Sequence, residues 1–128
     1  MKYRDKSNMA LTFVVDWMEA LNAGDVDGIV DLYDSESCVL VPPDGNDVIR
    51  GSEAIASYYL ALFEKYPGLE GKVHDQVNQN LGDNRRALSG HYTLRWNGGE
   101  EEERFTFVVV WDGYWVIHTH HASVDPQR

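Results

Sequence analysis

Residues 105–121 contain two apolar stretches separated by Asp112-Gly113, and this dipeptide constrains the fold more than any other feature of the chain. Asp-Gly between runs rich in valine, tryptophan and tyrosine is the strongest short-range signal for a β-hairpin. A two-residue turn at this point pairs Trp111 with Tyr114. Because side chains alternate between the two faces of a strand, this pair sets the register of both strands. We therefore expect the chain to end in an antiparallel sheet.

The other segments predict helices, an early hairpin and two further strands. Apolar residues at helical spacing predict helices over 8–22, 26–33 and 52–66, with Asp25 and Ser52 as caps of the second and third. The buried stripe of the first helix is expected at Leu11, Val14, Val15, Met18 and Leu21. Strand-forming residues between turns predict strands over 38–41, 48–51, 69–80, 86–96, 101–111 and 114–121. Residues 1–128 should therefore form a single α+β domain.

Composition excludes several classes of partner. The chain has 11 Lys and Arg against 21 Asp and Glu, a net charge of −10, which argues against nucleic acid and anionic membranes as partners. No apolar run approaches the roughly 20 residues of a membrane span, and the N-terminus lacks the pattern of a signal peptide. The lone Cys38 excludes an intrachain disulfide and a thiolate metal cluster, and it fits a reducing cytoplasm.

Three of the five histidines lie in the last strand, and the register of the hairpin decides which way they point. Counting back from the turn places Phe107 opposite His118 and Phe105 opposite His120, all on one face, with His121 on the other. A three-residue turn at Asn97-Gly98-Gly99 would add His91 beside Phe105. A two-residue turn there would move His91 to the opposite face.

Three segments carry a resemblance to a known family: "WMEALNAGDVDGIVDLY", "VPPDGNDVIRG" and "RFTFVVVWDGYWVIHTHHASVDP". Their order resembles the nuclear transport factor 2-like superfamily over nearly the whole chain. The last segment is most similar to SnoaL-like proteins and to the association domain of calcium/calmodulin-dependent kinase II. The resemblance implies a cone-shaped fold, in which a strongly bent, mostly antiparallel sheet wraps three N-terminal helices. It also implies a pocket at the open end and dimerisation through the sheet.

The resemblance also suggests what the pocket contains. Val41 and Val109 stand where the association domain has charged groups, while the aromatic residue of the third helix is retained as Tyr59. We therefore expect an apolar pocket whose polar groups are imidazoles, suited to a small, neutral, largely apolar ligand. The expected lining residues are Trp17, Tyr33, Val41, Tyr59, His91, Thr93, Phe105, Phe107 and Val109.

His118 and His120 are the best catalytic candidates, because a neutral imidazole in an apolar pocket can act as a general acid or base. Asp34 is a further candidate, with a turn residue as the alternative interpretation. His118, His120 and His91 could reach one metal ion, but no Asp or Glu completes the set, so we expect neither metal nor cofactor. The acidic run 100–103 is expected to be a solvated strand entrance.

Two hypotheses remain. The chain is a small-molecule binder or a cofactor-free acid–base enzyme of the isomerase, cyclase or dehydratase type, related to SnoaL-like proteins and ketosteroid isomerases. Alternatively, it is a non-catalytic homodimeric association domain. An open cavity that contains His118 or His120 favours the first hypothesis, and a filled interior favours the second.

Overall fold

The computed structural model describes residues 6–43 and 47–125. It contains four helices and six strands within these residues. The helices are α1 (Lys6–Leu11), α2 (Phe13–Asn22), α3 (Val26–Val30) and α4 (Ser52–Lys65). The strands are β1 (Val39–Val41), β2 (Ile49–Arg50), β3 (Glu70–Asn80), β4 (Arg85–Trp96), β5 (Gly99–Trp111) and β6 (Trp115–Val124).

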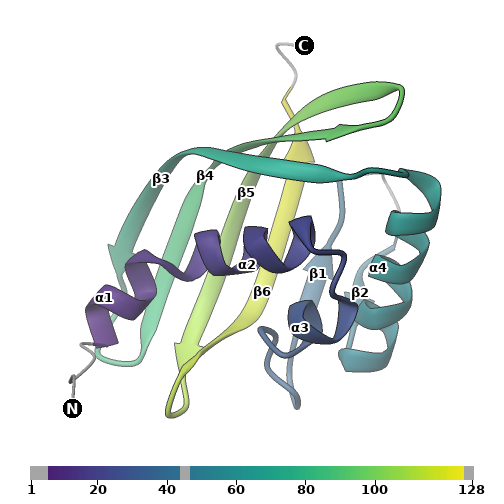
Figure 1. The fold of residues 1–128 in the computed structure, drawn as a ribbon. Helices are drawn as coiled ribbons and strands as arrows, with labels where there is room; N and C mark the ends of the chain where they lie inside the picture. The colour runs from purple at the N-terminus through teal and green to yellow at the C-terminus, as the bar shows by residue number, and fades with distance from the viewer. Residues whose placement is uncertain (1–5, 44–46, 126–128) are drawn as a thin grey trace, which may run out of the picture.

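The strands form one bent sheet in the order β2-β1-β6-β5-β4-β3, whose edge strands do not pair with each other (Figure 1). Strands β3 to β6 form the predicted antiparallel meander. The early hairpin adds to it through a parallel pairing of β1 with β6. Helix α2 lies across the sheet (Figure 1). Helix α4 packs against α3 and against β2, which is an edge strand of the sheet (Figure 1). The predicted α+β class and the helices held in a strongly bent sheet are confirmed. Residues 44–46 of the hairpin loop lie outside the described residues.

The first predicted helix is two helices, separated at Thr12. The Thr12 hydroxyl donates a hydrogen bond to the Met9 carbonyl, 3.2 Å away, and the helix axis changes direction there (Figure 1). The predicted buried stripe is therefore partly wrong, because Leu11 and Val15 are 54% and 47% exposed. The buried face of α2 consists of Phe13, Val14, Trp17, Met18 and Leu21.

The two predicted helix caps have different outcomes. Asp25 caps α3 as expected, since its carboxylate accepts a hydrogen bond from the Gly28 amide at 3.0 Å. Ser52 is the first residue of α4, and its N-cap is Gly51, which has a φ of 86°. Glycine adopts this left-handed conformation without the steric cost that a side chain adds, so backbone geometry determines where α4 begins.

The β5–β6 hairpin differs from the prediction at two points. Trp111 pairs with Trp115, so the turn has three residues, and a bulge between Val108 and Val109 leaves His118 without an opposite partner. Each difference shifts the register by one residue, and together they shift it by two. His120 is therefore opposite Phe107 and stays on the predicted inner face. His118, which lies at the bulge itself, is exposed.

The β4–β5 turn has two residues, Asn97 and Gly98, because Trp96 pairs with Gly99. His91 is therefore opposite Arg104, on the outer face of the sheet, and Gly90 takes the place beside Phe105. Among the described residues, no helix has both the length and the apolar character that a membrane span requires.

Candidate functional site

A cavity of about 110 Å³ lies on the inner side of the sheet, between α2, α4 and the paired ends of β4 and β5. Its wall is mainly aromatic. Six of the lining residues carry aromatic six-membered or indole rings: Trp17, Tyr58, Tyr59, Tyr66, Tyr92 and Trp96. Leucines from α2, β1, α4 and β4 fill the spaces between the rings. The predicted pocket members Trp17 and Tyr59 are therefore at this cavity.

His120 is the polar group that β6 contributes to the cavity wall, and it is only 2% exposed. Its Nδ1 atom lies 2.8 Å from the Tyr33 hydroxyl, which in turn lies 2.7 Å from the Tyr59 hydroxyl. The Phe107 ring packs edge-on against the imidazole, with centroids 4.3 Å apart. These hydrogen bonds connect His120 of β6, Tyr33, which follows α3, and Tyr59 of α4.

Backbone hydrogen bonds hold this chain of side chains in place. The Ile117 amide donates to the Leu32 carbonyl at 2.7 Å, and the Asp34 amide donates to the Ile117 carbonyl at 2.8 Å. These bonds fasten the segment around Tyr33 to β6 just before the bulge at His118. The bulge and this attachment together bring the Tyr33 hydroxyl to His120.

Burial determines the protonation state of these groups. Loss of solvation, followed by the charge of nearby His121, lowers the pKa of His120 to about 3. Burial also raises the pKa values of Tyr33 and Tyr59 well above 10.0, because the phenolate would be desolvated. At neutral pH the imidazole and both phenols are therefore uncharged, and each acts through hydrogen bonds.

One buried nitrogen atom of the cavity-lining residues, His120 Nε2, has no hydrogen-bond partner among the described residues. The Trp17 ring packs edge-on against this imidazole, with centroids 5.5 Å apart. The indole N–H of Trp17 is close enough to the Tyr33 and Tyr59 hydroxyls to oppose the rise in the pKa of both phenols. A buried polar atom without a partner costs about 1–3 kcal/mol, so native structures rarely leave one. His120 is therefore the lining side chain whose ring nitrogen would gain most from a polar group of a ligand.

Two glutamates of β5 also line the cavity, and sequence reasoning missed both. Glu103 is 3% exposed, and Glu101 is partly exposed. After burial, the charge of Glu103 and its hydrogen bond raise the pKa of Tyr92, so this carboxyl and this phenol are direct neighbours. The expectation that 100–103 is uniformly solvated is wrong, because strand alternation from Phe105 turns Glu103 and Glu101 inward.

Comparison with known families identifies the fold. The sequence matches the SnoaL-like domain family over residues 14–118, which is most of the chain. The chain belongs to the SnoaL-like domain family. A comparison with curated protein sequences gives no significant match.

Several solved structures share the fold of this chain. A proposed calcium/calmodulin-dependent protein kinase II association domain from Xanthomonas campestris is 28% identical, with a TM-score of 0.82 over 100% of this chain and 99% of the other. A ketosteroid isomerase-like protein from Erwinia carotovora atroseptica is 14% identical, with a TM-score of 0.77 over 95% and 98%. A proposed scytalone dehydratase from Novosphingobium aromaticivorans is 11% identical, with a TM-score of 0.76 over 93% and 83%. The last two likenesses establish the fold alone.

In this SnoaL-like domain, several predicted pocket residues belong to the core beside the cavity. Phe105, Phe107 and Val109 are fully buried and are not part of the cavity wall. Tyr33 lies behind Tyr59, to which it is hydrogen bonded. Val41 is half-buried, pairs with His121, and is not part of the cavity wall.

The other two catalytic candidates lie outside the cavity. His118 is exposed, and its Nδ1 and Nε2 atoms lie 3.2 Å from the Thr119 hydroxyl and 3.5 Å from the Ser37 hydroxyl. Asp34 accepts a hydrogen bond from the Glu36 amide at 3.0 Å and so takes the alternative interpretation, a turn residue. Of the three catalytic candidates, only His120 therefore belongs to the cavity wall.

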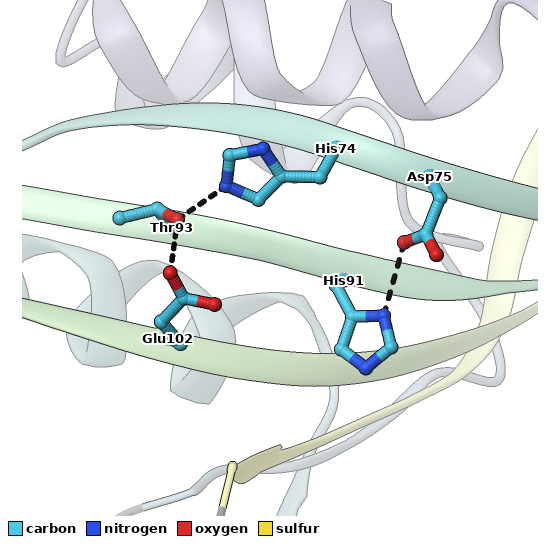
Figure 2. Close-up of polar contacts among 5 residues, drawn as sticks. All are labelled: His74, Asp75, His91, Thr93 and Glu102. Carbon is cyan, nitrogen blue, oxygen red and sulfur yellow. Dashed lines mark hydrogen bonds and ion pairs between the residues drawn. The ribbon is translucent and has the colours of Figure 1, made fainter. Parts of the chain in front are cut away.

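His91 and Thr93 lie on the outer face, because the two-residue turn after β4 reverses their expected direction. Figure 2 shows them in a polar cluster, with His91 Nδ1 3.0 Å from an Asp75 carboxylate oxygen. The Thr93 hydroxyl bridges His74 and Glu102. Their expected place in the pocket is wrong. Among the described residues, no group of three or more His, Cys, Asp or Glu is arranged to hold a metal ion.

Proposed function

We propose that this SnoaL-like domain binds a small, largely apolar organic molecule in the cavity beside His120. The observation that carries the proposal is a largely aromatic and aliphatic cavity whose wall includes the buried His120, and the Nε2 atom of His120 has no hydrogen-bond partner among the described residues. A polar group of a ligand that reached the edge of the imidazole would give Nε2 a partner. Specific polar contacts inside an apolar cleft are typical of small-molecule sites.

The size of the cavity supports a small ligand. Its volume is about 110 Å³, while an engineered protein cavity of about 150 Å³ binds benzene. A molecule with one six-membered ring is therefore of suitable size, with any further substituent extending towards the mouth. A four-ring steroid would need a much larger cavity.

Acid–base catalysis of the isomerase or dehydratase type is a second candidate function. Solved structures named as a ketosteroid isomerase-like protein and a proposed scytalone dehydratase share the fold, and the buried Glu103–Tyr92 pair is the favouring observation in this chain. A buried carboxyl can exchange a proton with a bound molecule. The neutral imidazole of His120 would orient the substrate through Nε2, and the Tyr59–Tyr33 hydrogen bonds would hold that imidazole in position.

We also propose that two copies associate through the outer face of the sheet, in the cytoplasm. The outer face carries exposed Val77 of β3 and half-buried Val108 and Val110 of β5, an apolar strip that a second sheet can cover. The reduced Cys38 is consistent with the location. Analytical ultracentrifugation tests the dimer, which has twice the 14.6 kDa mass of one chain. A monomer at all concentrations would contradict the dimer.

A thermal-shift screen of small apolar carbonyl compounds tests the ligand site. Ligands that bind the folded state raise its melting temperature, so hits on the wild type should lose their effect on His120→Ala. His121→Ala removes an exposed imidazole from the same strand and serves as the matched control. If no compound shifts the wild type, or if His120→Ala responds as strongly, the proposed site is wrong and the non-catalytic association domain becomes the better hypothesis.

A further inference from the structure

An uncharged patch covers the middle of the outer face of the sheet, between Arg85 at one end and Arg104 at the other. It extends over β3, β4, β5 and β6 and consists of Val77, Ala87, Ser89, Thr106, Val108 and Thr119. The hydroxyls of Ser89 and Thr106 lie 3.1 Å apart and hydrogen bond to each other. Since these two polar groups already have partners within the chain, a second protein surface can cover the patch without leaving them unsatisfied.

One row of side chains beside the patch carries both signs of charge. Ser123 of β6, Arg104 of β5, His91 of β4 and Asp75 of β3 lie opposite one another in this order. Asp75 Oδ1 lies 3.0 Å from His91 Nδ1, and the Asp75 side chain is still 68% exposed (Figure 2). Arg104 is exposed, and its guanidinium has no ion-pair partner within the part of the chain that the structure describes. The row therefore has an unpaired cation on β5 and an accessible anion two strands away.

We infer that a second copy of this chain packs on the outer face in one orientation, in which Arg104 of each copy pairs with Asp75 of the other. The inference rests on the proposed dimer and names the contacts that determine its geometry. The two-fold axis would run parallel to the strands and close to β4, so that β5 of one copy lies over β3 of the other.

Self-complementarity favours this axis. A two-fold rotation about an axis parallel to the strands places each row of side chains over the same row in reverse order. Arg104 then lies over the Asp75–His91 pair of the second copy, and the uncharged patch lies over its own counterpart. An axis across the strands would instead place Arg104 over the apolar side chains of the patch, where an unpaired charge is costly. A two-fold interface uses the same surface on both copies, so only a self-complementary orientation is stable.

The lengths of the two side chains fit this arrangement. Sheets that pack face to face lie about 10 Å apart, a gap that an arginine and an aspartate pointing towards each other can bridge. The planar guanidinium donates to carboxylates in charge-assisted hydrogen bonds. Asp75 can keep its contact with His91 through Oδ1 while Oδ2 accepts from Arg104 of the second copy. Each dimer contains two such pairs, one on either side of the axis.

Charge reversal tests the pairing. Asp75→Arg and Arg104→Glu each create two like-charged pairs across the interface, so either variant alone should raise the dimer dissociation constant at least about a hundredfold. Asp75→Arg also reduces the net negative charge of the chain, so general repulsion between copies would predict tighter association for this variant. Sedimentation equilibrium of the wild type and both variants gives the dissociation constants, and circular dichroism checks that both variants are folded.

An equimolar mixture of the two variants is the decisive experiment. Arg104 of the first variant then faces Asp75 of the second, and the arginine introduced at position 75 faces the glutamate introduced at position 104. Both contacts are favourable, so the variants should form a heterodimer with an affinity within about tenfold of the wild-type dimer. Native mass spectrometry should show one chain of each variant in this heterodimer.

The outcomes separate this inference from the proposed dimer. If the wild type is monomeric, both fail. If the wild type dimerises and both variants dimerise as tightly, or if the mixture forms no heterodimer, the Arg104–Asp75 pairing is overturned and the dimer stands. Glu19→Arg, on the exposed side of α2, makes the same charge change away from the sheet and should dimerise as the wild type does. If charge reversal unfolds either variant, Asp75→Asn and Arg104→Gln replace them, and each should weaken the dimer severalfold; wild-type affinity in both would overturn the pairing.

Discussion

The neutral state of the buried His120 imidazole predicts how the folded protein responds to acid. Burial, followed by the charge of His121, lowers the pKa of His120 to about 3, whereas the imidazole of an unfolded chain titrates near 6.5. Below pH 6.5 the unfolded chain therefore binds a proton that the folded chain does not bind until about pH 3. The contribution of His120 to stability is complete above 6.5 and is lost progressively as the pH falls from 6.5 to 3.

The size of this effect follows from the two pKa values. Each unit of difference between the folded and unfolded chain corresponds to about 1.4 kcal/mol of unfolding free energy. At about pH 4.5, which is about two pH units below the pKa of the unfolded imidazole, the folded imidazole is still unprotonated. The titration of His120 should therefore lower the free energy of unfolding by about 2.5 kcal/mol relative to pH 7. The full burial of the ring means that solvent screening does not reduce this figure substantially.

Urea denaturation of the wild type and of His120→Asn, at about pH 7 and pH 4.5, isolates the contribution of this one group. Asparagine can keep a hydrogen bond to Tyr33 but does not titrate, so the wild type should lose about 2.5 kcal/mol more than the variant. His118→Asn is the matched control and should follow the wild-type profile, because its imidazole is exposed in the folded chain. An equal acid sensitivity of wild type and His120→Asn would refute the account of a buried, neutral His120.

Three further perturbations test the packing around the site. Tyr33→Phe removes the hydroxyl between its two partners and should cost about 1–3 kcal/mol in chemical denaturation, while Tyr114→Phe, on the exposed turn, should cost almost nothing. Asp25→Ala removes the cap of α3 and should cost about 1 kcal/mol, and an unchanged denaturation midpoint would contradict the capping role. Gly90→Ala places a Cβ against the Asp75 carbonyl, so a loss of at least about 1 kcal/mol is expected. If Gly90→Ala is as stable as the wild type, the Asp75 backbone of β3 does not lie as close to residue 90 as the structure shows.

The elements of the fold were predictable because their signals are local. Helical periodicity and strand composition gave the order of elements, and Asp25 was recognisable as a cap. The break at Thr12 was not predictable, since residues 8–22 keep an apolar pattern across it. The N-cap of α4 is Gly51 in its left-handed conformation, and the sequence favoured Ser52 instead because serine is a common N-cap residue.

The site was only partly predictable, because it depends on register. The predicted face of His120 was correct, because an extra turn residue and a bulge together shifted the register by two residues, and a shift of two returns a side chain to the same face. The predicted inward direction of His118 was wrong, because His118 lies at the bulge. For His91, the choice between two turn lengths needed the structure. Glu103 could have been found, because it is two residues before Phe105 on the same strand face, but its position in an acidic run suggested solvent.

The most direct test of the site is a pair of ¹H–¹⁵N NMR spectra, a direct one for the Trp17 indole and a long-range one for the His120 ring nitrogens, during titration with cyclohexanone or benzyl alcohol. Both side chains line the cavity, so a bound molecule would change the surroundings of both rings. We predict that both resonances shift progressively and saturate together, while the exposed His118 nitrogens stay unchanged. Binding that leaves Trp17 and His120 unperturbed, or the absence of any saturable shift with either probe, would contradict the account.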